Sequence, residues 1–194
     1  LGALSSVTDK ADGTYTATLT ADVSTGTAHL TGTLNGSALT ATTVNFVPGP
    51  ANAAHSTLTT APGSLSANGT STAVVTVRAM DLHDNALTAG GASVILATDL
   101  GSLSSVTDNG DGTYTATLTS GTTAGTAQVT GTLNGSALTA TTVSLVPGAA
   151  NATQSTLVAT PNSLAANGAV TATVTLRAKD ANGNALTTGG AAVL

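Results

Sequence analysis

Cysteine and glutamate are absent from this chain, and aromatic and charged residues are scarce. Aromatic residues make up 2% of the 194 residues and charged residues 7%, and all nine acidic residues are aspartate. Without cysteine no disulfide can staple the core, so stability must come from burial and from hydrogen bonds between strands, although this does not fix the cellular compartment. Because Glu, Lys and Arg normally build exposed helical faces, essentially no α-helix is expected.

The charge balance is acidic. Four Lys and Arg residues against nine Asp give a formal net charge of −5 and a pI near 4.6. Nucleic acids and anionic membrane surfaces attract clustered Lys and Arg, so both partners are disfavoured. No apolar run approaches the roughly 20 residues of a membrane-spanning helix, and no charged-then-apolar leader is present. We expect no membrane insertion in this segment, and targeting signals would lie elsewhere.

The chain contains an internal repeat with a spacing of 99 residues. The stretch Asp108-Asn-Gly-Asp-Gly-Thr-Tyr-Thr-Ala-Thr-Leu-Thr119 matches Asp9-Lys-Ala-Asp-Gly-Thr-Tyr-Thr-Ala-Thr-Leu-Thr20, and no gap is needed elsewhere. A period of about 100 residues is too long for a solenoid and close to the size of one β-sandwich. The predicted domains are the C-terminal half of a repeat (1–48), a complete repeat (49–148) and the N-terminal half of a repeat (149–194).

Side-chain alternation predicts an all-β fold. Tyr114, Ala116 and Leu118 alternate with threonines, which is typical of a half-buried strand. The complete repeat contains about seven such strands, near residues 56–60, 73–80, 92–97 and 102–106 and in three segments that match 14–20, 26–34 and 37–47. Asn35-Gly36 predicts a two-residue hairpin turn. The Val47-Pro-Gly-Pro50 segment interrupts strand pairing and marks a domain boundary.

The two incomplete repeats would each expose an apolar strand face and unpaired edges. A half-sandwich of fewer than 50 residues is too small to be stable alone. The halves leave opposite ends of a domain whose strands, about 9 residues each, span roughly 30 Å, so they cannot easily meet within one chain. We expect that the end of one copy completes the start of the next, or that the sequence is a window of a longer array.

The turns and strands also carry a family resemblance. The run 171–193, with Asp180-Ala-Asn-Gly-Asn184, and the run Gly112-Thr-Tyr-Thr-Ala-Thr-Leu-Thr-Ser120 are the residues that carry it. They resemble the bacterial immunoglobulin-like repeats of the invasin and intimin type (group 1), across the whole chain. The resemblance implies tandem immunoglobulin-like β-sandwiches in a large adhesin, outside the cell or on the bacterial surface. Tyr15 and Tyr114 are similar to the structural tyrosine-corner residue of such domains.

Aspartates in the predicted turns are candidate calcium ligands, since Ca²⁺ needs six to eight oxygen ligands. The candidates are Asp99, Asp108, Asp111 and Asp180, with nearby asparagines. However, tight turns use Asx-Gly pairs in any case, and the glutamate that often completes a calcium site is absent. The prediction is therefore no metal and no cofactor, with Ca²⁺ as the alternative.

No catalytic constellation stands out. His29, His55 and His83 have no histidine counterpart at the 99-residue spacing, which favours isolated surface histidines. No Gly-x-Ser-x-Gly nucleophile motif accompanies the many serines. The chain is therefore predicted not to be an enzyme.

Two functions remain. The first is a structural repeat module of an adhesin stalk or surface fibre, whose partners are neighbouring repeats or other copies of the chain joined head to tail through complementary half-domains. The second is a carbohydrate- or host-protein-binding module. Binding surfaces are usually enriched in Tyr, Trp, Phe and Arg, and the complete repeat offers only Tyr114 and Arg78. The structural function is therefore favoured.

Overall fold

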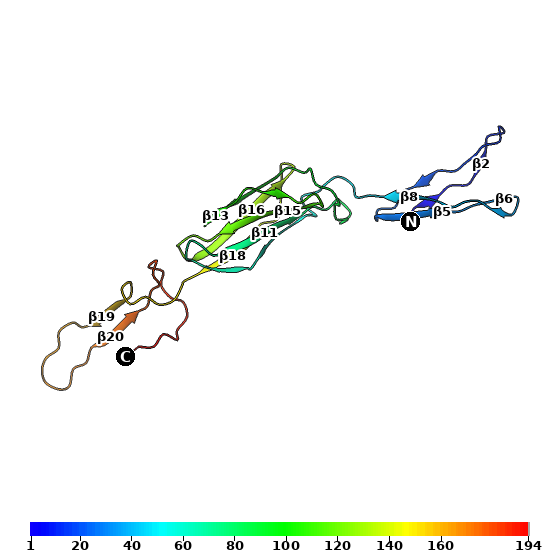
Figure 1. Ribbon diagram of the computed structural model, residues 1–194. Helices are drawn as coiled ribbons and strands as arrows, with labels where there is room; N and C mark the ends of the chain where they lie inside the picture. The colour runs from blue at the N-terminus through cyan, green and yellow to red at the C-terminus, as the bar shows by residue number, and fades with distance from the viewer. Residues whose placement is uncertain (194) are drawn as a thin grey trace.

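The computed structural model describes residues 1–193 as three β-structures in a row, with the two termini at opposite ends (Figure 1). Every assigned element in these residues is a strand, so the predicted all-β fold class is confirmed. Strands β1–β8 lie in the N-terminal segment (residues 1–48), β9–β18 in the middle unit (49–148) and β19–β20 in the C-terminal segment (149–193). Within the described residues, no helix has the length and apolar character needed to cross a membrane.

One sheet of the middle unit has five strands in the order β10-β18-β16-β12, with β17 also paired to β16. Strand β10 runs parallel to β18, and the other pairs are antiparallel. The strands are β10 (Ser64–Ser66), β12 (Val94–Thr98), β16 (Gly125–Leu133), β17 (Ser136–Ala137) and β18 (Thr141–Val146).

The second sheet of the middle unit also has five strands, in the order β13-β15-β11-β9, with β14 paired to β15. All its pairs are antiparallel. The strands are β9 (Thr57–Ala61), β11 (Thr72–Arg78), β13 (Ser102–Leu103), β14 (Thr107–Asp108) and β15 (Thr113–Thr119).

The core of the middle unit lies between these two sheets. Val75 and Val77 of β11 and Leu118 of β15 belong to the same buried cluster as Val129 of β16 and Val143 of β18. Buried and less buried residues alternate along β11 and β15, as the period of two predicts. Each fully buried Val or Leu contributes about 1.5–3 kcal/mol, which stabilises this cysteine-free sandwich.

The two flanking segments contain shorter pairings. In the N-terminal segment the pairs are β1-β4, β2-β3, β5-β8 and β6-β7, all antiparallel. The C-terminal segment contains one antiparallel pair, β19-β20. The strands are β1 (Ala3–Leu4), β2 (Thr8–Asp9), β3 (Tyr15–Thr16), β4 (Leu19–Thr20), β5 (Gly26–Leu30), β6 (Thr33–Leu34), β7 (Ser37–Ala38), β8 (Thr42–Phe46), β19 (Thr156–Thr160) and β20 (Thr173–Arg177).

The middle unit has ten strands where about seven were predicted, because several strands are short or interrupted. The predicted strand that matches residues 37–47 is split into β17 and β18, both paired to β16. Ala137 lies opposite Thr132 and Thr141 opposite Val129, so the register shifts by one residue between the two. An extra residue of this kind bends a strand and interrupts its pairing.

The predicted Asn-Gly hairpin turn is confirmed. Asn35 and Gly36 both have positive φ values, 50° and 82°, and connect β6 to β7. Asn134 and Gly135 do the same between β16 and β17, with φ values of 50° and 81°. Positive φ at both central residues is the requirement of the hairpin turn that Asn-Gly favours.

Candidate interdomain junctions

A polar turn of the same design lies at each meeting point of two units. In the middle unit the turn is Asp81-Leu-His-Asp-Asn85, which follows β11. In the C-terminal segment it is Asp180-Ala-Asn-Gly-Asn184, which follows β20. A backbone hydrogen bond closes each turn, from the first residue's N–H to the last residue's carbonyl, at 2.9 Å in both. The two turns therefore present their Asp and Asn side chains in the same way.

The Asp81 carboxylate connects the first turn to the linker between units. Asp81 is 3% exposed. Its Oδ1 accepts hydrogen bonds from the backbone N–H groups of His83 (2.9 Å) and Asn85 (3.0 Å). Its Oδ2 accepts from Asn85 Nδ2 (2.9 Å) and from the N–H of Gly49 (2.8 Å). Because Gly49 lies in the linker between β8 and β9, this carboxylate fixes the chain where it enters the middle unit.

The Asn85 side chain connects the same turn to the preceding unit. Its Nδ2 donates to the carbonyl oxygen of Val23 at 2.7 Å, and its Oδ1 accepts from the N–H of Thr25 at 3.3 Å. Val23 and Thr25 lie in the loop between β4 and β5 of the N-terminal segment. One amide side chain thus contacts both the buried carboxylate of its own unit and the loop of the unit before it.

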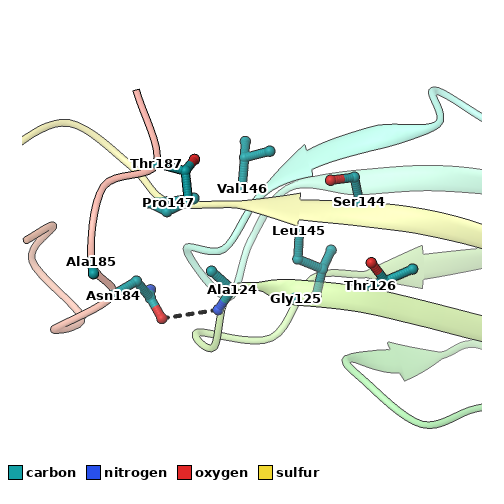
Figure 2. Close-up of a pocket in the computed structure, with 10 residues that line it drawn as sticks. All are labelled: Ala124, Gly125, Thr126, Ser144, Leu145, Val146, Pro147, Asn184, Ala185 and Thr187. Atoms are coloured by element: carbon teal, nitrogen blue, oxygen red, sulfur yellow. Dashed lines mark hydrogen bonds between the residues drawn. The ribbon is translucent and has the colours of Figure 1, made fainter. Parts of the chain in front are cut away.

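The second junction repeats these contacts 99 positions further along the chain. Asp180, which is 1% exposed, accepts a hydrogen bond from the N–H of Gly148 at 2.9 Å. Asn184 Nδ2 donates to the carbonyl oxygen of Thr122 at 2.9 Å, and its Oδ1 accepts from the N–H of Ala124 at 2.9 Å (Figure 2). One further bond runs from Asn182 Nδ2 to the carbonyl oxygen of Ala67 at 2.9 Å.

Hydrogen bonds hold both carboxylates in their ionised form. The Asn85 side chain is the largest cause of the lowered pKa of Asp81, and the backbone N–H groups of Gly49, Asn85 and His83 lower the pKa further against the opposing effect of burial. The pKa of Asp180 is lowered in the same way, first by the Asn184 side chain. Amide N–H groups therefore stabilise these charges.

An open hollow of about 420 Å³ lies beside the second junction, between the end of β18 and the polar turn (Figure 2). A matching hollow lies beside the first junction, where Phe46 and Pro48 correspond to Leu145 and Pro147. The ten residues that line the second hollow carry no titratable side chain: they are Ala124, Gly125, Thr126, Ser144, Leu145, Val146, Pro147, Asn184, Ala185 and Thr187. The hollow therefore offers shape and hydrogen-bonding groups, but no acid–base group among its lining residues.

The candidate calcium residues lie at three separate places and use their oxygens in local contacts. Asp108 and Asp111 accept backbone hydrogen bonds in the turn before β15, and Asp108 also accepts from the N–H of Gly91 at 2.7 Å. Asp99 accepts from the N–H of Gln128 on β16 at 2.7 Å, and Asp180 lies at the second junction. Across residues 1–193, no three His, Cys, Asp or Glu side chains gather as a metal site would require. Calcium binding stays a prediction.

The two tyrosines of identical local sequence lie in different surroundings. Tyr114 is 1% exposed, and its hydroxyl oxygen accepts a hydrogen bond from the N–H of Ala92 at 2.9 Å. Tyr15 is 58% exposed. The structural role of Tyr15 and Tyr114 stays a prediction.

A side-chain contact between a histidine and an aspartate accompanies the first junction. His55 Nδ1 lies 2.7 Å from Asp84 Oδ1, which is in the polar turn. The sequence favoured an isolated surface histidine at position 55 and did not predict a carboxylate partner. The corresponding residues of the next unit are Gln154 and Gly183, so the pair does not recur.

Sequence reasoning placed the polar turns but missed their contacts with neighbouring units. The contacted residues lie 32 to 115 positions away in the sequence, and the contacting atoms are backbone atoms. A usable signal was nevertheless present. The Asp and Asn at the ends of the turn recur at the 99-residue spacing, whereas the three residues between them all differ.

A middle unit of two packed sheets, hydrogen-bonded to a like segment at each end, defines an array of tandem immunoglobulin-like sandwiches. The family model described as "Invasin, domain 3" matches residues 1–49, 52–148 and 151–194. The chain therefore belongs to the invasin domain 3 family, and the resemblance inferred from the sequence is confirmed. This membership also confirms the predicted extracellular or bacterial cell-surface location.

Three solved structures are similar to the chain. Invasin, described as a bacterial integrin-binding protein, is 28% identical with a TM-score of 0.62, and the match covers 89% of this chain and 36% of that one. The Escherichia coli adhesin FdeC is 31% identical with a TM-score of 0.64, and the match covers 95% of this chain and 60% of that one. InvD of Yersinia pseudotuberculosis is 31% identical with a TM-score of 0.61, with 96% and 59% covered. The chain thus spans between about a third and three fifths of these structures.

Proposed function

We propose that this chain is a structural repeat module that forms a stalk or fibre of an extracellular bacterial adhesin. The observation that carries the proposal is the junction, in which the same atoms of an Asp and an Asn connect consecutive units at both meeting points. A stalk needs each unit to be held at a defined angle to the next. A repeated junction contact supplies that constraint.

The linkers between units support this function. Strand β8 ends at Phe46 and β9 begins at Thr57, and Pro48 and Pro50 stiffen the intervening chain. Relative motion is the usual behaviour of domains that share only a small interface. Here the Asp81 carboxylate holds the linker and Asn85 holds the preceding loop, so bending would break hydrogen bonds on both sides of the turn. The units would therefore keep a fixed spacing and transmit force along the row.

The similar proteins support an adhesive and non-catalytic role for the parent molecule. Invasin is described as an integrin-binding protein and FdeC as an adhesin. In this proposal the repeats of this chain hold a binding region away from the cell surface and perform no reaction themselves. Asp81 and Asn85, and their counterparts Asp180 and Asn184, are engaged in hydrogen bonds to the linkers and to the preceding units.

Consecutive copies, in this proposal, also join head to tail. The N-terminal segment matches the second half of the middle unit and the C-terminal segment matches its first half, so each carries the face that the other would cover. Where more sequence of the same kind adjoins this chain, that sequence would cover the same faces.

A distance measurement across the second junction tests the stalk function. Because the chain has no cysteine, Thr142→Cys on β18 and Thr173→Cys on β20 can carry a pair of spin labels. We expect a narrow distance distribution, and a clearly broader one after Asn184→Ala. The matched control is Asn109→Ala, because the Asn109 side chain hydrogen-bonds to Thr113 of its own unit, and it should leave the distribution narrow. A distribution that is already broad in the unsubstituted chain would contradict a stalk.

An array of glycans and host proteins distinguishes the alternative function, a binding module, from the stalk. Specific binding by the 194-residue chain, together with a broad distance distribution, would favour the binding module over the stalk.

A further inference from the structure

The N-terminal segment exposes residues that the middle unit buries. Residues 13–20 and 112–119 have the same sequence, Gly-Thr-Tyr-Thr-Ala-Thr-Leu-Thr. In the middle unit this stretch forms β15, which pairs along its whole length with β11. In the N-terminal segment it forms only the two short strands β3 and β4, which pair with β2 and β1. The missing neighbour is therefore a strand equivalent to β11.

The C-terminal segment contains that strand. Strand β20 corresponds to β11, and Val174 and Leu176 occupy the positions of Val75 and Val77. Val75 is 0% exposed, whereas Val174 is 62% exposed. On its other side β20 pairs with β19, as β11 pairs with β9. The C-terminal segment thus has its edge strand in place and an apolar face without a cover.

We propose that two copies of this chain form an intermolecular sandwich, in which β20 of one copy pairs antiparallel with residues 14–20 of the next. This inference rests on the head-to-tail joining in the proposed function and adds its register. In the middle unit Thr72 lies opposite Thr119 and Arg78 opposite Thr113. Applying the 99-residue spacing places Thr171 opposite Thr20, and Arg177 opposite Thr14.

The chemistry of the two faces fits this pairing. Residues that point into the core of the middle unit are apolar on both strands, and the corresponding positions are also apolar: Ala172, Val174 and Leu176 on one side and Tyr15, Ala17 and Leu19 on the other. No charged side chain occupies any of these six positions. The second sheet would be completed in the same way, because β10 pairs with β18 in the middle unit and residues 163–165 are the counterpart of β10 for β8.

Within this 194-residue sequence the other end of the same chain cannot be the partner, so the proposed partner is a second copy. The N- and C-terminal segments lie at opposite ends of the molecule, with the middle unit between them (Figure 1). The hydrogen bonds at both junctions hold the two segments in these positions. The two free faces of one copy therefore cannot meet each other.

A mixture of two blocked variants tests the pairing. The first variant carries Val174→Asp, which blocks its C-terminal face, and Thr16→Cys. The second carries Leu19→Asp, which blocks its N-terminal face, and Thr175→Cys. Thr16 and Thr175 correspond to the opposed pair Thr115 and Thr76. Only the mixture should form a dimer, the dimer should be one to one, and oxidation should join it by a disulfide, because opposed residues lie within disulfide reach.

The control moves one cysteine along the strand. Replacing Thr16→Cys with Thr18→Cys keeps an exposed threonine position on the same face, but places the thiol diagonally, about 7–8 Å between Cα atoms, which a disulfide does not span without movement. Disulfide formation in the mixture should be at least about tenfold slower for this control. Thermal unfolding of the middle unit, measured for every variant, shows that the substitutions have left it folded.

Each outcome decides the question. Equal cross-linking rates for the two cysteine positions would overturn the register, and a mixture that stays monomeric in sedimentation velocity at all concentrations would overturn the association itself. The proposed stalk function is judged separately, by the distance distribution across the second junction. A narrow distribution without dimers would leave the stalk standing and remove this inference alone.

Discussion

The middle unit and the N-terminal segment contain the same eight residues in two different states. In the middle unit seven of them, residues 113–119, form one continuous strand, with Tyr114 and Leu118 in the core. In residues 13–20 they form two short strands with the tyrosine in solvent. Since the local sequence is identical, intrinsic β-propensity cannot explain the difference. The neighbouring strand β11 and a complete opposite sheet, which only the middle unit has, decide whether this sequence becomes a core strand.

The C-terminal segment shows the same dependence on a neighbouring strand. Strand β11 is paired on both edges, whereas β20 is paired only to β19. Val75 is buried and Val174 is exposed at corresponding positions. The burial of an apolar strand face in this protein therefore depends on the complementary half-unit.

The largest expected effect is the difference in stability loss between a leucine replaced in the middle unit and the corresponding leucine replaced in the N-terminal segment. Leu118→Ala should lower the unfolding free energy of the middle unit by about 2–5 kcal/mol, because it removes a fully buried side chain. Leu19→Ala, in identical local sequence, should change the unfolding free energy of the chain by less than about 0.5 kcal/mol in dilute solution. Urea unfolding measures both. Equal losses would show that the N-terminal segment is already packed like the middle unit.

Replacing the two tyrosines should produce a smaller difference in stability. Tyr114→Phe removes the hydroxyl that accepts the Ala92 hydrogen bond, so the middle unit should lose about 1 kcal/mol. Tyr15→Phe should have no measurable effect on dilute chains, because Tyr15 is exposed. The same urea experiment decides the point. If Tyr114→Phe were also silent, its structural role would be contradicted.

Acid should weaken the junctions before it affects the uncharged core. The pKa values of Asp81 and Asp180 are lowered in the folded chain. A lowered folded pKa means that the stabilisation is fully present above the unfolded value, near 3.9, and is lost as the pH falls through the folded value. We expect the distance distribution across the second junction to stay narrow at pH 7 and to broaden in strong acid. Asp180→Asn should already be broad at pH 7 and change less on acidification.

The smallest expected effect is that of a chelator. A cation that binds only the folded state would raise the melting temperature, so its removal would lower it. Because each candidate aspartate is engaged by backbone N–H groups, we expect EDTA to leave the melting temperature unchanged. A fall that added Ca²⁺ reverses would support the calcium alternative.

Much of the middle unit could be predicted from the sequence, because its signals are local. The alternation in residues 113–119 and the turn at Asn134-Gly135 both depend on near neighbours, and both are found. Strand β10 was missed because three residues give almost no periodicity and its partner β18 lies about 80 positions further along. The same alternation overestimated the strand at residues 14–20, where the chain provides no strand equivalent to β11 beside it.

The junctions could be predicted only in part. The turn at residues 81–85 follows from its Asp and Asn residues, but the atoms that it contacts in the preceding unit are backbone groups without a sequence signature. What the sequence does contain is the recurrence of Asp81 and Asn85 as Asp180 and Asn184. That recurrence, at positions whose neighbours vary, is the pattern expected of a contact that each unit must make.

Hydrogen exchange of the two identical eight-residue stretches tests the central claim most directly, because their side chains give them closely similar intrinsic rates. In the dilute 194-residue chain, amides of residues 13–20 should exchange much faster than those of residues 112–119. When the chain is concentrated, or when the two blocked variants are mixed, protection of residues 13–20 should rise to that of residues 112–119. Full protection of residues 13–20 in the dilute monomer, or none in the associated state, would contradict the claim that a complementary half-unit completes the fold.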